Sequence, residues 1–250
     1  MLRLFSNIRK SLLAENNTVK YAKYAVGEVL LIMVGILLAL QVQTWNEERR
    51  LQQERRELIE SLIMDFGTTL RLLDEDLERA QSNLAGFEKF LRAAVGENNA
   101  MSFDEIKERA RDGFRGNFFQ PSIGSYRAAQ SSGALSLIND AILQELFVEF
   151  EQANKAWQSI EEISRENTFV GVRLELRKIL GTENVLIQMP DRFRPKAFEL
   201  TEKEYREIIA DKEVYAIFST IRSIRGFQTQ NLSNLKRITE EILIALETLD

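Results

Sequence analysis

The sequence contains no cysteine and no histidine, and these two absences exclude several kinds of chemistry. Without cysteine there is no disulfide and no thiol nucleophile, and without both residue types there is no Cys/His zinc site. A histidine general acid or base is excluded as well. Catalysis would have to rest on Asp, Glu, Lys, Ser, Thr, Tyr or Arg. We therefore expect a protein that is not an enzyme and that uses no cofactor or metal.

Proline is also scarce, with three in 250 residues and none before Pro121. Because proline interrupts helices, its absence favours long ones. No segment has the convincing period-two alternation that is typical of strands. The phosphate-binding loop, the dinucleotide fingerprint and the G-x-S-x-G motif are all missing. The sequence predicts an all-α fold.

Positive charge is unevenly distributed along the chain. The formal net charge is −5, but residues 1–45 carry five cations and two carboxylates, which gives +3 there and −8 over the rest. Nucleic-acid binding needs clustered positive charge, so we expect no nucleic-acid partner. An acidic body that follows a basic, apolar N-terminal region indicates a soluble domain on a membrane anchor.

The longest apolar run spans residues 24–45, "YAVGEVLLIMVGILLALQVQTW". As a helix it would rise about 32 Å, which matches a hydrocarbon core of about 30 Å. A secretory signal peptide would have a shorter apolar region and a small-residue cleavage site, whereas this run continues directly into "QVQTWNEERR". We predict a retained transmembrane helix, with the lipid bilayer as a partner.

This interpretation divides the chain into an interfacial amphipathic segment (1–19), a transmembrane helix (20–45) and a helical-bundle extramembrane domain (46–250). A short basic tail is hard to translocate, whereas a long following domain crosses largely regardless of its charge. We therefore expect a bacterial inner (cytoplasmic) membrane protein with its N-terminus in the cytoplasm and its body in the periplasm.

Small and polar residues interrupt the apolar run and are candidates for helix packing or for lining a pore: Gly27, Glu28, Gly35, Ala39 and Gln41. Gly35-x-x-x-Ala39 is a small-x-x-x-small pattern, which lets helix backbones approach closely, so we expect a homo-oligomer. Glu28 has two interpretations. It lies near the inner interface, within reach of headgroups or nearby lysines, or it faces another helix or a water-filled path.

Two segments carry a resemblance to a known family. "KYAKYAVGE" followed by "GILLALQVQTWNEER", and then "SYRAAQSSGALSLINDAILQELFVEF", resemble an uncharacterised bacterial family of single-pass membrane proteins, a domain of unknown function. The anchor signature of that family is K-Y-x-K-Y-A-x-G-E, then A-L-Q-x-x-x-W-N-E. Ala129 departs from the family pattern, which has leucine there. The resemblance implies the anchor and a helical ectodomain, and it implies no activity.

The anchor helix is predicted to continue out of the membrane as one long helix to about Val95, with bends at Gly67 or Gly86. Its second half has a heptad-like spacing of apolar residues, which is typical of coiled coils: Leu73, Leu77, Ala80, Leu84, Phe87 and Leu91.

Further helices are predicted from caps and periodicity. A short helix should run from the capping box Ser102–Glu105 to Gly113, and another should end at Ser132 with Gly133 as its left-handed cap. A long helix should run from Asn139 or Asp140 to about Leu180, with a bend near Gly171. A capping box is expected at Thr201–Glu204, and a last helix should run from about Lys212 to Leu249. Residues 181–200 form a predicted loop. The expected body is an antiparallel bundle of three long helices with short ones packed against it.

Two segments of the body are candidates for binding a metal ion, a ligand or a partner protein. The acidic run Asp74, Glu75, Asp76 and Glu78 lacks the glycine and the ligand spacing of a calcium loop, so we interpret it as a solvated helix face. The loop that begins at residue 113 is rich in aromatic and basic residues. Its aromatic side chains either cap the end of the bundle or fill a satellite core, or else the loop contacts a ligand or a partner protein. The residues are Phe114, Arg115, Phe118, Phe119, Tyr126 and Arg127.

The sequence favours a membrane-anchored α-helical interaction or sensory module that acts through self-association or a partner protein. The alternative is a homo-oligomeric pore or ion channel with one transmembrane helix per subunit, in which Glu28 and Gln41 face the lumen.

Overall fold

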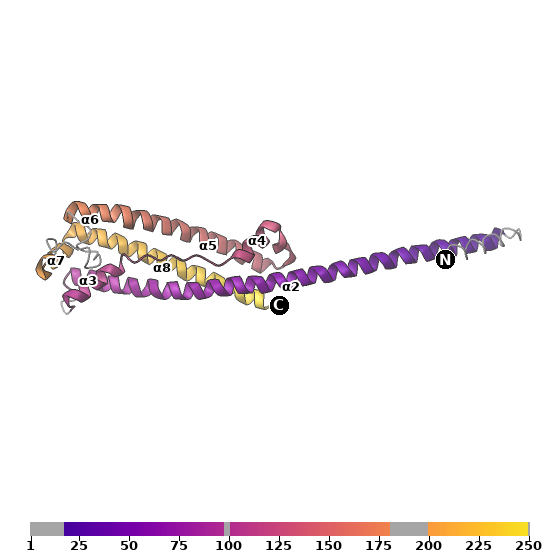
Figure 1. Cartoon of the computed structure of the whole chain (residues 1–250), viewed down its shortest axis with the longest axis horizontal. Coiled ribbons are helices and arrows are strands. Elements are labelled where there is room, and N and C mark those ends of the chain that lie inside the picture. The colour runs from indigo at the N-terminus through magenta and orange to yellow at the C-terminus, as the bar shows by residue number, and fades with distance from the viewer. Residues whose placement is uncertain (1–17, 98–100, 181–199, 250) are drawn as a thin grey trace, which may run out of the picture. The chain divides into compact units, whose positions relative to one another are not determined.

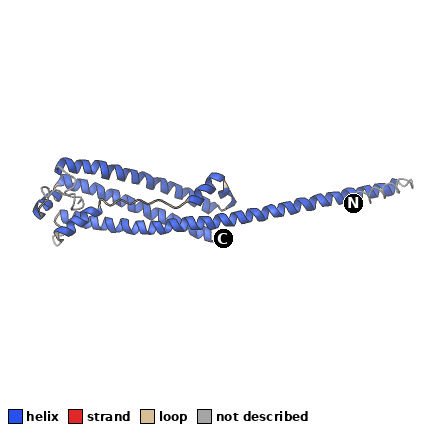
Figure 2. Cartoon of the chain, in the orientation of Figure 1, coloured by secondary structure: helices blue, strands red, loops and turns tan. Residues whose placement is uncertain are grey.

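A computed structural model of the chain describes residues 18–97, 101–180 and 200–249. Every regular element among these residues is a helix, and none is a strand (Figure 2). The all-α prediction is therefore confirmed. The predicted interfacial segment falls almost wholly outside the described residues, and so does nearly all of the predicted loop at 181–200.

Helix α2 (Thr18–Ala94) is continuous over 77 residues, which confirms the predicted long helix. The chain forms two compact units, Met1–Glu57 and Leu58–Asp250, and α2 contributes residues to both. Exposed ion pairs between neighbouring turns, such as those of Arg50 with Glu47 and Glu54, support the helix. Gly96 ends it with a φ of +81°, a conformation that glycine adopts without strain.

In the first unit, α2 carries the apolar run. Within the part of the chain that the structure describes, this is the one helix long and apolar enough to cross a membrane. Each large apolar side chain from Val26 to Val42 is more than half exposed. The division at residue 45 between lipid and solvent stays a prediction.

The second unit is built on three long helical segments, which Figure 1 shows. They are α2 from Leu58 onward, α5 (Ala141–Arg165) with its continuation through the π-helix η2 (Glu166–Val172) into α6 (Arg173–Leu180), and α8 (Lys212–Glu247). Their apolar faces form two buried clusters. The first cluster includes Ile59, Leu62, Leu143, Leu146, Ile242 and Leu246. The second cluster includes Phe87, Phe90, Leu176, Val214 and Phe218.

These clusters show how the three helices run. The start of α5 and the end of α8 both meet the early part of the bundle segment of α2, and the start of α8 meets its end. Helix α8 is thus antiparallel to its two neighbours, whereas α2 and α5 are parallel. The predicted antiparallel arrangement is correct for α8 and wrong for the pair α2 and α5. Two parallel neighbours need a connection that returns the chain across the bundle.

Residues 113–123, which we call the strap, provide that connection. After α3 (Phe103–Asp112) the strap runs along the bundle to α4 (Gly124–Ser132), which the 3-10 helix η1 (Ala134–Leu137) follows (Figure 1). Trp157 Nε1 donates a hydrogen bond of 3.0 Å to the Phe119 carbonyl. Thr69 Oγ1 exchanges two bonds of 3.0 Å with the Ser122 backbone. An extended segment cannot satisfy its own backbone groups, and these side chains do so instead.

Side chains also define the helix ends. Asp65 of α2 accepts hydrogen bonds from the backbone N–H groups of Ser125 and Tyr126 at the start of α4. Asp140 caps α5, and Gly133 closes α4 with a φ of +78°.

The two predicted capping boxes have different outcomes. Thr201 and Glu204 form a complete box at the start of α7 (Glu202–Ile209), and these hydrogen bonds lower the pKa of Glu204. At α3 only half of the box exists, because Ser102 accepts from the Glu105 N–H and the structure gives no return bond from the Glu105 carboxylate.

Candidate functional site

A polar layer separates the two apolar clusters. Along α8 the buried positions recur every three or four residues, and Arg225 and Gln228 occupy two of them between Ile221 and Leu232. Ile224 is apolar and precedes Arg225, but it is only half-buried. Counting apolar residues alone missed the two polar positions, although the heptad spacing through residues 221 and 232 pointed to them.

Arg225 connects three segments inside this layer. Its Nε donates to the Gly113 carbonyl at 2.8 Å, and its Nη1 donates to Ser164 Oγ at 3.0 Å and to Gln228 Oε1 at 2.6 Å. The guanidinium is buried, and this burial lowers its pKa to about 10. No carboxylate among the described residues pairs with it, and its Nη2 has no partner there. Arg225 therefore orients the strap and α5 through neutral oxygens.

The bend predicted near Gly171 takes the form of η2. This π-helix starts two residues after Ser164, whose side chain bonds to Arg225. Thr168 lies within η2, is fully buried, and finds no hydrogen-bond partner for Oγ1 among the described residues. A π-helix adds a residue to a turn, so it changes which side chains point inward at this level of the bundle.

Asp112, at the end of α3, lies against α2. Its carboxylate is 2% exposed and pairs with Arg109 and Arg115, each at 3.1 Å. A Cβ at Gly86 would overlap Asp112 Oδ2. Helix α2 continues through Gly86, which was predicted as a possible bend, and the residue instead provides room for a buried carboxylate.

A pocket of about 350 Å³ lies between α2 and the strap, and we call it the strap pocket. It is lined by Asp76, Arg79, Asn83, Arg115, Gly116, Asn117 and Phe118. The α2 residues follow one another at three- and four-residue spacing, so they share a face of the helix. The strap residues of the lining are consecutive. This is expected where an extended segment runs along one face of a helix.

The strap pocket contains charges of both signs. Asp76 is buried and forms an ion pair with Arg79. Arg115 belongs to the strap part of the lining and pairs with Asp112. The Arg115 side chain remains 57% exposed. Asn117 is 6% exposed, and no described residue forms a hydrogen bond with its side-chain amide. The pocket thus combines paired charges with an amide that no described residue bonds.

The aromatic and basic residues predicted near the strap fall into two groups. Phe114 belongs to the second cluster, and Phe119 and Tyr126 belong to the first, so these three fill the main core and not the end of the bundle. Burial and the nearby Glu151 carboxylate raise the pKa of Tyr126 to about 12. Phe118 is 71% exposed and lines the strap pocket together with Arg115.

Arg127 lies on α4, and the acidic run lies on α2. Arg127 is exposed on α4 and does not line the strap pocket. Asp74, Glu75 and Glu78 are exposed, as predicted, but Asp76 is buried. The predicted seam is wrong at this turn, because Leu77 is only half-buried and Asp76 is buried in its place. Asp76 lies next to strap residues in the lining of the strap pocket, so the strap covers it. The described residues include no cluster of acidic side chains that could hold a metal ion.

The candidates in the apolar run all lie on α2. A Cβ added at Gly27 or Gly35 would meet no atom within 4 Å, and Ala39 and Gln41 are exposed. Glu28 is half-buried. The surfaces of Gly27, Gly35, Ala39 and Gln41 are therefore open to an external contact. The role of all five residues in helix packing or in a pore stays a prediction.

Comparison of the chain with family models, with curated proteins and with solved structures finds no match. The resemblance seen in the sequence stays a hypothesis based on its own motifs. Two of its features now have structural settings: "SY" begins α4 at the Asp65 cap, and Ala129 is buried in the same helix.

Proposed function

We propose that this protein is a membrane-anchored α-helical interaction or sensory module, which acts through self-association or a partner protein. One observation carries the proposal: the same uninterrupted helix, α2, contains both the exposed apolar run and one wall of the strap pocket. A helix that serves two regions can communicate a change in packing from one to the other.

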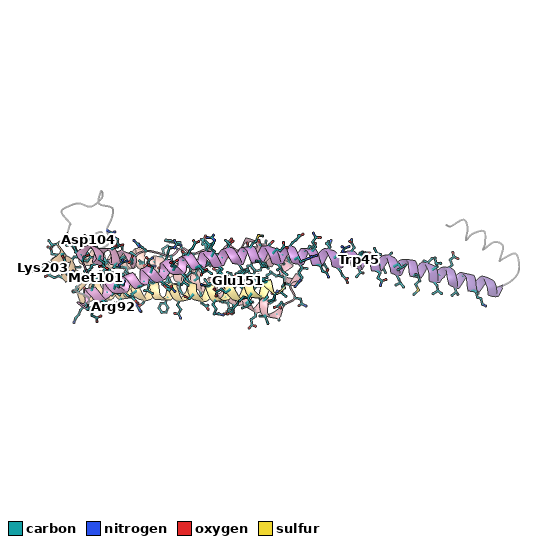
Figure 3. All side chains as sticks on the ribbon, turned by 90° about the horizontal axis from the view of Figure 1, so that it is seen from below. Trp45, Arg92, Met101, Asp104, Glu151 and Lys203 are labelled. Carbon is teal, nitrogen blue, oxygen red and sulfur yellow. The ribbon has the colours of Figure 1, made fainter. Side chains whose placement is uncertain are left out.

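The anchoring part of the proposal rests on the cost of exposing the apolar run to water. Large apolar side chains that remain more than half exposed from Val26 to Val42 would be unfavourable in water, at about 25 cal/mol per Å² of apolar surface. A lipid bilayer removes that cost. Trp45 lies at the polar end of the run (Figure 3). The Arg49 guanidinium carbon lies over the Trp45 ring, 4.9 Å from its centroid. Such amphipathic groups favour a membrane interface.

The sensory part rests on the contacts that α2 makes in the bundle. Asp65 and Thr69 hold the end of the strap and the start of α4, and Asp76 and Arg79 line the strap pocket. A ligand or partner that moves the strap would therefore alter contacts of α2 itself. We place the N-terminus in the bacterial cytoplasm, the anchor in the inner membrane and the body in the periplasm, and we expect a homo-oligomer.

The pore alternative would need several copies of α2 around a lumen, and the described residues offer no observation that favours it over the anchored module. Glu28→Gln tests it directly. In planar bilayers, a pore lined by Glu28 would change its cation selectivity when this charge is neutralised. A module without a pore would pass no current with either residue.

The anchored arrangement is tested with intact spheroplasts and inverted membrane vesicles. The protein should stay in the membrane fraction after a carbonate wash. Protease added to spheroplasts should remove the residues after Asn46, and inverted vesicles should protect them. Release by carbonate would refute the anchor, and protection of the body in spheroplasts would refute the proposed orientation.

A further inference from the structure

The strap pocket is lined by one carboxylate, by two guanidinium groups and by two neutral amides, and Arg79 is already paired with the Asp76 carboxylate on the same helix. We propose that this pocket binds a free α-amino acid, whose carboxylate contacts Arg79 and Arg115 and whose ammonium group contacts Asp76. The inference gives the proposed sensory module a ligand and rests on that proposal for its biological purpose.

Both arginines retain hydrogen-bond donors after their contacts within the protein. Arg79 uses Nε on the Glu75 carbonyl and Nη2 on Asp76, so Nη1 remains without a partner among the described residues. Arg115 uses Nη1 on Asp112, which leaves Nε and Nη2. A guanidinium has five N–H donors in a fork that fits a carboxylate, so each arginine can bind a second one.

Asp76 supplies the opposite charge. It is 8% exposed, and Arg79 contacts only its Oδ1. No described residue donates a hydrogen bond to Oδ2. A carboxylate oxygen in a mostly buried setting attracts an ammonium group more strongly than one in water does, because the local dielectric constant is lower.

Neutral groups complete the lining. The Asn117 side chain is buried without a partner in the described part of the chain, and Asn83 is half-buried and equally without one. An amide without a partner among the described residues can exchange hydrogen bonds with a ligand in place of water. The Phe118 ring lies against Gly116, where a Cβ would come within 3.1 Å of it, and offers an apolar wall to a ligand side chain.

This combination selects against other ligand classes. Asp76 would repel a phosphate or a dicarboxylate, and the two guanidinium groups would repel a simple amine. A metal ion would find only one carboxylate in the lining. The volume of about 350 Å³ lies at the lower end of the range of about 300–1,000 Å³ for small-molecule pockets, so the ligand is small. A zwitterion of amino-acid size satisfies both charges at once.

Isothermal titration calorimetry on the full chain in detergent tests the proposal. The probes are the individual standard amino acids and, for each one that binds, its deaminated acid and its decarboxylated amine. We expect at least one amino acid to bind, and both analogues to bind at least about tenfold more weakly, since each loses one charged contact. No binding of any amino acid at concentrations up to about 10 mM would overturn the proposal. Equal binding of either analogue would overturn it as well.

Two arginines of α2 provide a matched pair of variants. Arg79 and Arg71 are similarly exposed, at 68% and 62%, and each pairs with an acidic residue of the same helix, but only Arg79 lines the strap pocket. Arg79→Gln should weaken amino-acid binding at least about tenfold, and Arg71→Gln should leave it unchanged. Equal effects of the two substitutions, or no effect of either, would contradict the assignment.

Asn83→Ala provides a second variant in case Arg79→Gln disturbs the fold, which circular dichroism would reveal. It removes an amide that no described residue uses, so the helix should stay folded while affinity falls. Unchanged affinity in a folded Asn83→Ala protein would contradict the role of the amides. Calorimetry in detergent needs neither the bilayer nor assembly. A failure here leaves the anchored module intact, and a failure of the spheroplast test leaves the pocket intact.

Discussion

Helix α2 carries two kinds of apolar surface, and they differ in period. From Val26 to Val42 apolar residues occupy all sides of the helix, and the large ones are more than half exposed. From Ile59 to Leu91 they recur every three or four residues and are buried against α5 and α8. A helix that is apolar all round needs an apolar solvent, whereas one with an apolar stripe needs neighbouring helices. The period, more than the amount of apolar residue, separates the two environments.

The largest expected effect comes from truncating one large apolar side chain in each of the two environments. Phe66 is fully buried, and its ring centroid lies 5.7 Å from that of Tyr126 and 5.2 Å from that of Phe150. Phe66→Ala should lower the free energy of unfolding of the bundle by about 3–5 kcal/mol. Leu37→Ala, in the exposed run, should leave it unchanged.

Urea titration followed by circular dichroism measures both variants. Similar losses for Phe66→Ala and Leu37→Ala would show that the two surfaces of α2 depend on the same contacts, and the comparison would then fail.

An intermediate effect should distinguish two glycines within the buried half of α2. A Cβ at Gly67 would meet nothing within 4 Å, whereas one at Gly86 would overlap the buried Asp112 carboxylate. Gly67→Ala should stabilise the bundle by about 0.5–1 kcal/mol, because glycine is unfavourable in a helix interior. Gly86→Ala should destabilise it by about 1–3 kcal/mol, because Asp112 must move away from its arginine partners.

The same urea titration compares these two substitutions. Stabilisation by both would mean that α3 moves away from α2 at little cost, and the role assigned to Gly86 would be wrong.

The smallest expected effect tests the exposed half. If Gly35 lies in a contact between helices of two copies, Gly35→Leu should weaken self-association by about 1 kcal/mol. Val34→Leu is the control, because it adds bulk at the neighbouring position, which lies on a different face of the helix. Sedimentation equilibrium in detergent measures the association constant. An unchanged constant for Gly35→Leu would place this glycine against lipid.

Local signals explain which parts of the fold were predictable. Asp140 and Gly133 each act on the backbone within a few residues, so the sequence alone locates the ends of α5 and α4. The apolar run and the long proline-free stretch likewise predict α2 and its ability to cross a membrane. Each of these features depends on neighbours along the chain, and no distant contact is needed to interpret them.

The candidate site was only partly predictable. The aromatic loop was recognised, and Arg115 and Phe118 do line the strap pocket, but Asp76, Arg79 and Asn83 come from a helix that passes the loop only in three dimensions. Asp76 was interpreted as part of a solvated face because the acidic run lies in a helical pattern and lacks the glycine and the ligand spacing of a calcium loop. Its burial follows from the strap, which covers that side of α2.

The all-α class, the extent of α2 and its exposed apolar run were determined by the sequence alone, because hydrophobic period and helix caps act over a few turns. Only the tertiary structure decided that α2 and α5 run parallel, that Arg225 lies between two apolar clusters, and that Gly86 accommodates Asp112. These outcomes depend on the path of the strap across the bundle. That path brings together residues far apart in sequence, and no local pattern records which of them will meet.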